Sequence, residues 1–588
     1  MTAKLSKVET AKQNSRNLRG TILPVLADES IPAFEHDDLQ VLKFHGIYQQ
    51  DDRDKRIERR KAGLDKAYSM MIRIALPGGR CSAEQYLDLD DLCDTHANGS
   101  LRVTTRQAFQ LHGVLKGNLH ATMKRISDRL MTSLAACGDI PRNMTATPAP
   151  IRDDAHRHAQ QLAADLALDL APSSGAYHEI WIDGEKYFNS DKHRLDEQAG
   201  VVDLDGEEPF YGDSYLPRKF KIGVALDTDN SIDVFTNDAS FLAITEDDGQ
   251  GGRETIGYNL NVGGGFGMTH NKADTIARIA TPIVFVPKDR AVEAMRTVVA
   301  IFRDHGNRSD RRAARIKYLL EAWGVEKFRA EFEARFGPAE DPRDTPRPFQ
   351  FDHLGRHDQG DGKQWVGVYI PSGRIIANYK NAFRELVTEL RPGVTLTASQ
   401  SILFTDLTPE QADRAEAILS AHDLPLVETL SGARRYHQAC VALPTCGLAL
   451  TDAERALPGV IDHLEGELEP LGLRDVPMTV RMTGCPNGCA RPYNADIGLV
   501  GRKPGVYHLF VGGGLSGDRV ADLFAADVPV GEITATLRPL LERFAEERDD
   551  DEGLSDFYRR IKGETDDRKL ICGKETPTGE EVLAAVVV

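Results

Sequence analysis

The stretch Ile72–Arg80 reads IRIALPGGR, and Val366–Arg374 reads VGVYIPSGR. Further along, Thr104–Leu111 reads TTRQAFQL and Thr397–Phe404 reads TASQSILF. The interval from the proline to the threonine is 27 residues in the first copy and 26 in the second. A helical pattern follows each copy, so both predict strand, turn, helix, strand and helix. This regularity indicates an internal repeat.

A second pair of related stretches follows in the same order. The segment 258–265 reads YNLNVGGG and 507–514 reads YHLFVGGG, each after an apolar run typical of a strand. Gly-rich turns recur in many α/β proteins, but two pairs in one order favour duplication. We therefore expect an α+β fold with pseudo-twofold symmetry, built from two small and two larger α/β modules. The predicted boundaries are an arm and linker at 1–69, modules at 70–134, 135–349, 350–428 and 429–570, and a tail at 571–588.

The two copies differ in charge. Arg73 in the first copy aligns with Gly367 in the second, and Arg106 aligns with Ser399. A symmetric scaffold with cations in one half only predicts an anion site in that half. The equivalent place in the second half would then be structural.

Composition limits the classes of function. The chain has 588 residues, too many for a single hydrophobic core. Its net charge of −18 argues against nucleic acid as a partner, because phosphate binding requires a basic surface. The first 20 residues have no apolar core typical of a secretory signal, and no stretch is long enough to span a bilayer. We expect a cytoplasmic protein without a membrane partner.

Four of the eight cysteines form two tight pairs. They lie in CVALPTC at 440–446 and in CPNGC at 485–489. Four thiolates match the need of a cubane [4Fe–4S] cluster, one for each iron. Zinc also binds thiolates, although its sites more often have two-residue gaps. The spacing favours the cluster and leaves zinc as the alternative.

Longer motifs resemble the siroheme-containing sulfite and nitrite reductases. Those around the cysteines are ALPTCGLALTDAERALP and TGCPNGCARPYNADIGLVG. FHGIYQQDDRD, TTRQAFQLHG, YLPRKFKIG and GNRSDRRAARIKYLLE resemble the same family in the same order. The resemblance runs from about Leu18 to about Asp556 and is nearest to the assimilatory sulfite reductases. It implies two ferredoxin-like half modules and two α/β modules around siroheme and the cluster.

By this resemblance, four cysteines hold the cluster, and the last of them also ligates the siroheme iron through its sulfur. The implied ligands are Cys440, Cys446, Cys485 and Cys489. One shared thiolate would couple the two metal centres electronically. The remaining cysteines match no ligand position and are interpreted as buried or incidental: Cys81, Cys93, Cys137 and Cys572.

The resemblance assigns four catalytic cations to the substrate anion: Arg73, Arg142, Lys219 and Lys221. Convergent Arg and Lys side chains would replace the hydration of sulfite and stabilise its departing oxygens. A single Arg or Lys is usually a solvated surface charge. Here Arg73 lies inside an apolar strand pattern, and the two lysines alternate on one face of a predicted strand before IGVAL. Charge buried there is costly without an anion.

Siroheme carries many carboxylates, so its pocket must be rich in donors. The resemblance favours carboxylate binding over an ordinary charged helix face for Arg106, Gln110, His112, Asn143, Arg308, Arg311, Arg315 and Lys317. The glycines at 263–265 and 512–514 would let the backbone approach the macrocycle closely.

The resemblance implies the six-electron reduction of sulfite to sulfide in sulfur assimilation. The sequence shows no flavin or nicotinamide fingerprint, so the electrons must come from another protein. The acidic chain would repel an acidic ferredoxin, which favours an NADPH-oxidising flavoprotein docked through the arm with its run QQDDRDKRIERRKAG. Ferredoxin remains the second candidate.

Two alternatives remain open for the activity. The first is a siroheme nitrite reductase producing ammonia. In that branch the motif matching YLPRKFK generally ends in Asn, so Lys221 favours sulfite. The second is a zinc-stabilised protein without enzymatic activity on the same scaffold.

Overall fold

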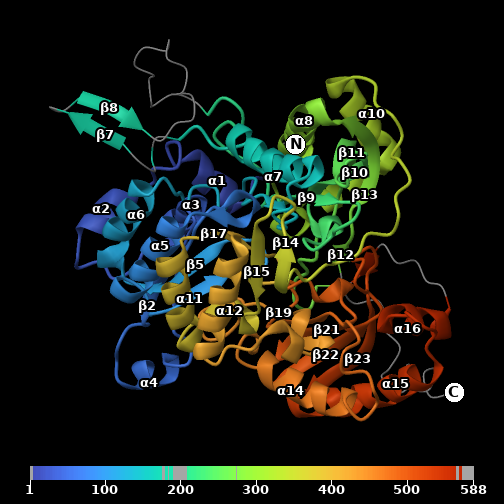
Figure 1. The fold of residues 1–588 in the computed structure, drawn as a ribbon. Helices are drawn as coiled ribbons and strands as arrows, with labels where there is room; N and C mark the ends of the chain where they lie inside the picture. Colours follow the sequence, from blue (N-terminus) through green and yellow to red (C-terminus); the bar gives the residue numbers. More distant parts are fainter. Residues whose placement is uncertain are drawn as a thin grey trace.

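The computed structural model describes residues 4–174, 176, 179–182, 185–189, 208–272, 274–563 and 569–571. These residues form four sheets of five strands and two sheets of two strands, with helices packed against them (Figure 1). Cys572 and nearly all of the predicted tail lie outside the described residues. No helix in the described ranges combines the length and the apolar character that crossing a membrane requires.

Two of the large sheets are built alike and exchange edge strands. One has the order β1-β2-β5-β4-β16 and the other β14-β15-β18-β17-β3. The strand β3 (Arg80–Cys81) pairs with β17, and β16 (Arg374–Ile375) pairs with β4, so each half module completes the sheet of the other. The other bounds are β1 (Ile47–Asp51), β2 (Tyr68–Arg73), β4 (Leu101–Val103), β5 (Phe109–Val114), β14 (Gly355–Asp358), β15 (Gln364–Val368), β17 (Gly393–Leu396) and β18 (Ile402–Leu407).

The two half modules share one hydrophobic core, to which both sheets and their helices contribute. Ser82 begins one helix of the first half module and Thr408 begins one helix of the second, each with a reciprocal capping box. The helices are α5 (Ala83–Thr95), α6 (Leu119–Asp128), α11 (Asn378–Leu390) and α12 (Pro409–Ala421). The first sheet also takes β1 from the segment predicted as an arm outside the repeat. Three of the five residues of β1 are only half-buried, which explains why its sequence IYQQD has no clear alternation.

The other two five-stranded sheets repeat one topology. The orders are β6-β9-β10-β11-β13 and β19-β20-β21-β22-β23, with three parallel strands followed by two antiparallel ones in each. The bounds are β6 (Thr145–Ala146), β9 (Ile222–Leu226), β10 (Ala239–Asp247), β11 (Arg253–Val262), β13 (Thr281–Pro287), β19 (His437–Ala439), β20 (Val480–Thr483), β21 (Ile497–Lys503), β22 (Val506–Val511) and β23 (Asp522–Pro529). The duplicated fold predicted from the sequence is confirmed at the level of strand order and direction.

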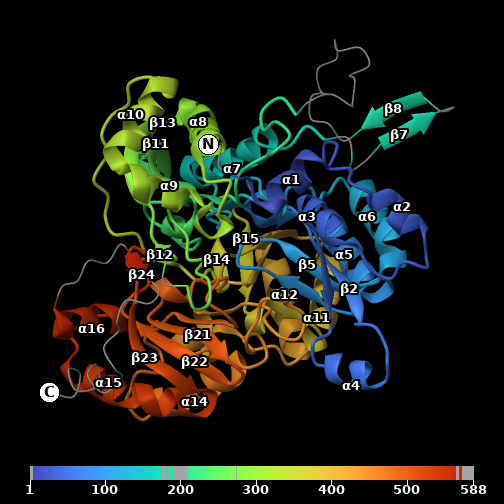
Figure 2. The same cartoon turned by 180° about the vertical axis from the view of Figure 1, so that it is seen from behind.

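Helices cover each of these larger sheets. The first core includes α7 (Asp154–Asp169), α8 (Ala291–His305), α9 (Ile316–Trp323) and α10 (Val325–Phe336). The second includes α14 (Leu457–Leu468), α15 (Ile533–Glu547) and α16 (Leu554–Lys562). The remaining elements are α1 (Lys7–Gln13), α2 (Ile22–Ala27), α3 (His36–Phe44), α4 (Arg56–Lys61), α13 (Gly432–Arg435), β7 (Glu179–Ile182), β8 (Glu185–Asn189), β12 (Ile276–Arg278) and β24 (Lys569–Ile571). Figure 2 shows α4 standing out from the body of the molecule on its own loop.

Glu454 joins the exchanged sheet edge to the second large module. Its carboxylate accepts hydrogen bonds from Arg102 Nε at 2.7 Å and from Arg374 Nε at 2.6 Å. The two arginines are register partners on β4 and β16. Although burial acts in the opposite direction, these arginines lower the pKa of Glu454. The carboxylate is therefore charged and compensates two cations at the junction of the halves.

We expect Glu454→Gln to lower the free energy of unfolding by roughly 3–5 kcal/mol, because it leaves two enclosed guanidinium groups without a counter-charge. Urea unfolding followed by circular dichroism measures this loss. Glu389→Gln is the matched control, since Glu389 pairs with Arg414 at the surface and its loss should cost far less. Equal losses in the two variants would contradict this role for Glu454.

Candidate active site

The four cysteines of the two tight pairs lie on loops at one edge of the second large sheet. Cys440 directly follows β19, and Cys485 lies two residues beyond β20. These two strands are parallel neighbours, so their carboxyl ends meet at the same edge. Gly484 N donates a hydrogen bond to Cys440 Sγ at 3.3 Å, and Asn487 Nδ2 donates one to Cys485 Sγ at 3.4 Å. Such donors stabilise negative charge on sulfur.

The charges of these thiols influence one another. Burial and the neighbouring Cys489 raise the pKa of Cys440 well above its usual value, and the same two causes raise that of Cys485 to about 11. Burial also raises the pKa of Cys446. Within the described residues, no three His, Cys, Asp or Glu side chains lie close enough together to hold a single metal ion. A cubane instead takes one thiolate at each iron, so this donor set fits a four-iron cluster.

Lys219 and Lys221 lie on the approach to the same cysteines. They flank Phe220, which forms a bridge with Pro141, and they precede β9 rather than lying in it as predicted. Burial and the nearby Arg315 and Arg142 lower the pKa of Lys219 to about 7, whereas the charge of Cys489 raises it. Burial, Lys219 and Arg106 lower the pKa of Lys221 well below its usual value. The two half-buried ammonium groups therefore share one cation-rich space with Cys489, whose side chain is exposed.

Arg73 and Arg142 contact a neighbouring pair of residues. Arg73 ends β2, and its Nη1 donates a hydrogen bond to Cys137 Sγ at 2.9 Å, while its Nε is buried without a hydrogen-bond partner. Arg142 donates to the carbonyl of Gly138 at 3.1 and 3.3 Å. Burial lowers the pKa of Arg142, but Tyr48 and Cys137 outweigh burial and raise it.

Tyr48, on β1, is a site residue that the sequence analysis missed. Burial and the charge of Cys137 raise its pKa, and a hydrogen bond joins it to Arg142. It lies inside the quoted motif FHGIYQQDDRD, so the signal was present but was not resolved to one residue. Cys137, interpreted as incidental, lies beside Arg73 in this group.

Gln110 and His112 lie two residues apart on β5, so their side chains lie on the same face of the strand. Both have buried polar atoms without a hydrogen-bond partner among the described residues. Both ring nitrogens of His112 and Oε1 of Gln110 are buried without a hydrogen-bond partner. Burial and the cations Arg374, Arg102 and Arg73 lower the pKa of His112 well below its usual value. Buried polar groups without partners are rare, and here they lie near Arg73. These atoms fit a large polar group such as the carboxylated tetrapyrrole implied by the resemblance.

Arg106 lies in the turn between β4 and β5. Its guanidinium donates to Asn237 Oδ1 at 2.8 Å, to Asn143 O at 2.6 Å and to Ile222 O at 2.8 Å, whereas its Nε is buried without a partner. Burial, Arg491 and Arg142 lower the pKa of Arg106 to about 9. The side chain of Asn143 hydrogen-bonds only main-chain groups, among them Leu76 and Arg106. Asn143 therefore holds this turn, and its predicted binding of a cofactor carboxylate stays a prediction.

The cluster of cations at 308–317 has protein partners that the prediction did not include. Arg308 pairs with Glu9 at 2.6 Å, Arg311 with Asp139 at 2.7 Å, and Arg315 with Asp238 at 2.5 Å. Lys317 Nζ donates to the carbonyls of Gly265 at 2.9 Å and Gly267 at 3.0 Å. Arg308 thus connects to α1 through Glu9. Arg315 and Lys317 contact the glycine loop, and the binding of cofactor carboxylates by these residues stays a prediction.

The glycines at 263–265 are required by this packing. A Cβ on Gly265, whose φ is +143°, would lie 2.4 Å from the guanidinium of Arg315. In the second copy Gly512, which is equivalent to Gly263, has φ +104°, and its Cβ would lie 2.8 Å from the ring of Tyr558. In both loops a Cβ would meet protein side chains, and the close approach to a macrocycle stays a prediction.

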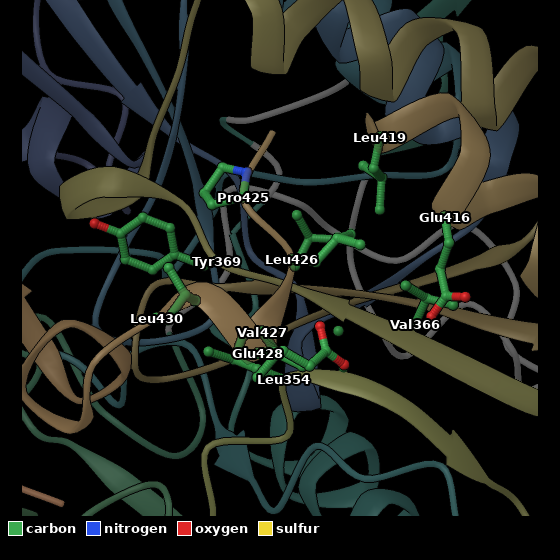
Figure 3. Close-up of a pocket in the computed structure, with 13 residues that line it drawn as sticks. Leu354, Val366, Tyr369, Glu416, Leu419, Pro425, Leu426, Val427, Glu428 and Leu430 are labelled. Atoms are coloured by element: carbon green, nitrogen blue, oxygen red, sulfur yellow. The ribbon is translucent and has the colours of Figure 1, made fainter. Parts of the chain in front are cut away.

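One enclosed cavity lies away from these residues, between the second half module and the segment after α12. It has a volume of about 20 Å³ and is lined mainly by apolar side chains, with Glu416 and Glu428 at its rim (Figure 3). It contains neither a cation nor a thiol. The candidate active site is therefore the cation-rich space beside Cys489.

Family models match both parts of the duplicated fold. A nitrite/sulfite reductase ferredoxin-like half domain matches residues 64–128 and 357–422, and a nitrite and sulphite reductase 4Fe-4S domain matches 164–339. The NirA protein of Mycobacterium tuberculosis has a similar fold, with a TM-score of 0.75, 24% sequence identity, and coverage of 95% of this chain and 96% of that one.

Curated relatives match nearly the whole chain. The sulfite reductase [ferredoxin] of Synechococcus elongatus is 44% identical over 95% of this chain and 90% of its own length. The sulfite reductase [NADPH] hemoprotein beta-components of Myxococcus xanthus and Staphylococcus haemolyticus are 43% and 41% identical, each over 95% of this chain and 96% and 95% of their own lengths. The chain belongs to the nitrite and sulfite reductase family.

Proposed function

We propose that this protein reduces sulfite to sulfide. The observation that carries the proposal is the half-buried group of cations formed by Lys219, Lys221, Arg106 and Arg142 near Cys489. Within the described part of the chain, none of these four cations forms an ion pair with a carboxylate. Burying such charge is costly, so the space is suited to a small anion that enters and leaves. The names of the relatives at 40–44% identity support sulfite as that anion.

The cofactors are a [4Fe–4S] cluster and siroheme, which supply electron storage and an iron that binds the substrate. The protein supplies the rest of the chemistry. Arg73 and Arg142 can orient the oxyanion through their guanidinium groups. Lys219, with a pKa of about 7, can hold or release a proton at Nζ near neutral pH. Oxygen atoms leaving as water require such a proton source beside them.

The cofactor assignment predicts coloured protein. We expect purified protein to show siroheme absorption bands and about five iron atoms per chain, four in the cluster and one in the tetrapyrrole. Cys489→Ser should abolish the coupling between the two centres seen by electron paramagnetic resonance. Cys81→Ser, at a buried cysteine outside the site, is the control and should keep it. Colourless protein that contains zinc would refute the proposal.

Lys221 is the residue that we propose favours sulfite over nitrite. Its main-chain N donates to Asp238 Oδ2 at 2.9 Å, and the equivalent Thr479 N in the second half donates to Asp496 Oδ2 at 2.9 Å. The duplicated scaffold thus places an ammonium group at a position where the other half has a neutral hydroxyl. Sulfite carries more negative charge than nitrite and gains more from this ammonium.

We expect Lys221→Asn to lower kcat/KM for sulfite about tenfold more than kcat/KM for nitrite, because one charge-assisted interaction is lost. Steady-state assays with a chemical reductant measure both ratios without a donor protein. Lys503→Asn, at an exposed lysine at the end of β21, is the control and should change neither. Equal losses of kcat/KM with the two substrates would show that Lys221 does not determine the preference for sulfite.

We propose that the electron donor docks on the segment 52–66, which includes α4. Arg53 connects this segment to the cysteine loop, since its N donates to Pro444 O at 3.1 Å and its Nη1 donates to Cys446 O at 3.1 Å. Asp54 accepts from Arg455 Nη1 at 2.7 Å on the same side. Electron transfer requires a short path, and the hydrogen bonds of Arg53 place this segment against the loop that carries Cys446.

The surface chemistry of this segment suits an acidic partner. It contains seven Lys or Arg residues and four Asp or Glu residues, a net charge of +3 in a chain of net charge −18. Arg60 and Lys61 are exposed, and neither forms an ion pair within the described residues. Ile57 and Leu64 are 59% and 56% exposed, and Leu448 on the cysteine loop is 68% exposed. An acidic one-electron carrier would meet both the charge and the apolar contacts.

The local positive charge of this segment makes an acidic donor protein possible in spite of the negative net charge of the chain. The preference for an NADPH-oxidising flavoprotein rested on the net charge of the chain, which would repel ferredoxin at long range. At contact the basic segment attracts an acidic protein, because charges beyond about 10 Å are screened at 0.1 M salt. The proposal therefore extends to an acidic ferredoxin as well as to an acidic flavin domain.

We expect Arg60→Glu/Lys61→Glu to slow reduction by a [2Fe–2S] ferredoxin about tenfold at low salt, since charge reversal acts on the association rate. Stopped-flow reduction of the protein measures this rate. Turnover driven by reduced methyl viologen should be unchanged. Lys288→Glu/Lys327→Glu makes the same change in net charge at exposed lysines beside α8 and on α10 and should have little effect. Equal slowing in both double variants would refute docking on this segment.

A further inference from the structure

Two equivalent loops meet at the pseudo-twofold axis between the large sheets. Asp233 and Arg491 each precede a short 3₁₀ turn, Val234–Thr236 and Pro492–Asn494, and each has a left-handed backbone, with φ of +51° and +57°. The first loop joins β9 to β10, and the second joins β20 to β21. The two residues are therefore equivalent in the duplication, and their side chains form an ion pair of 2.5 Å with each other.

Arg491 also binds the equivalent turns of the two half modules. Its Nη1 donates to Thr105 O at 2.8 Å, and its Nη2 donates to Ala398 O at 3.1 Å. Thr105 in TTRQ and Ala398 in TASQ occupy the same position of the repeat. One guanidinium thus joins both half modules to the loop that carries Cys489. Burial lowers the pKa of Arg491 to about 10, and Asp233 opposes this effect.

The side chains at these equivalent positions differ. Thr105 Oγ1 donates a hydrogen bond to Cys489 O at 3.1 Å, whereas Ala398 has no hydroxyl. Two residues before Asp233, at the position of Cys489, the first half has Ser231, which is 1% exposed. At the position of Thr105 in the two equivalent turns of the half modules, only the turn that contacts Cys489 therefore has a hydroxyl.

We propose that Thr105 is a positioning residue that fixes the main chain of Cys489 relative to the cation-rich space. The proposal rests on the proposed function, in which the sulfur of Cys489 joins the two metal centres. Arg491 and Asp233 hold the carbonyl side of Thr105, and the Thr105 hydroxyl holds the carbonyl of Cys489, so the segment 489–491 is clamped at both ends. A thiolate shared by two metals tolerates little displacement, because both ligand geometries must be met at once.

The clamp can be tested with a nearly isosteric substitution. Thr105→Val removes the hydroxyl without changing charge or shape, and Thr105→Ser restores a hydroxyl. Thr397→Val is the matched control, because the hydroxyl of Thr397 accepts a hydrogen bond only from Ser401 N within its own turn. Amide hydrogen exchange of the peptide containing 488–491 is measured in the purified protein. Visible absorption, the midpoint potential of the siroheme and kcat for sulfite are measured in the same preparations.

For Thr105→Val we expect exchange at 488–491 to rise about fivefold, the equivalent of one neutral hydrogen bond. The siroheme bands and potential should shift and kcat should fall, with KM for sulfite little changed. Thr105→Ser and Thr397→Val should match the unsubstituted protein in every readout. Unchanged exchange and an unchanged spectrum in Thr105→Val would overturn the proposal. If the unsubstituted protein contains no siroheme and Thr105→Val still raises exchange at 488–491, the clamp is supported and the proposed function is refuted. The two failures can therefore be distinguished.

Discussion

The half-buried positive charge beside Cys489 is the constraint on which the rest of this structure depends. Arg73, Arg106, Arg142, Lys219 and Lys221 have no carboxylate partner among the described residues, although each is at least partly buried. Such an arrangement opposes folding unless the scaffold holds it by other means. The main-chain carbonyls that accept from Arg106 and Arg142, and the thiol of Cys137 beside Arg73, provide that hold. The remaining charge is available to an anion.

The duplication explains how the fold tolerates a group of cations without carboxylate partners in the part of the chain that the structure describes. Both halves contain the same sheet, the same turn before a 3₁₀ helix and the same buried aspartate, Asp238 or Asp496, capping the strand that begins beside it. Only one half has Lys221, where the other has Thr479, and only one has Cys489, where the other has Ser231. The first half therefore carries the cations of the site, and the second half carries the four cysteines of the two tight pairs. Glu454 and Asp233 then compensate the arginines at the junction.

Local features of this fold could be predicted from the sequence, and non-local pairings could not. The repeat and the two cysteine pairs depend on spacings of a few residues, which the sequence displays directly. The exchange of β3 and β16 pairs Val394 with Cys81 and Arg374 with Arg102, 313 and 272 positions apart, through strands of two residues that leave no periodic pattern. The arginines at 308–315 were assigned to carboxylates of a cofactor, but Arg308 pairs with Glu9 and Arg315 with Asp238. A sequence shows a cation without showing which distant anion folding brings to it. Tyr48 was missed for the same reason, since its strand has no alternation and its partner Arg142 is remote.

Two of the four thiols have different surroundings: Cys446 lies beside the basic segment 52–66, and Cys489 lies beside the cations of the site. Cys446 lies on the side of Arg53, whose Nη1 binds its carbonyl and connects it to the basic segment at the surface. Cys489 lies on the other side, where its charge acts on Lys219 and Lys221. A cluster held by these thiols would therefore have one corner toward the docking surface and another toward the anion. Because the fold separates these two faces, the charge that attracts a donor protein and the charge that binds a substrate can be adjusted independently.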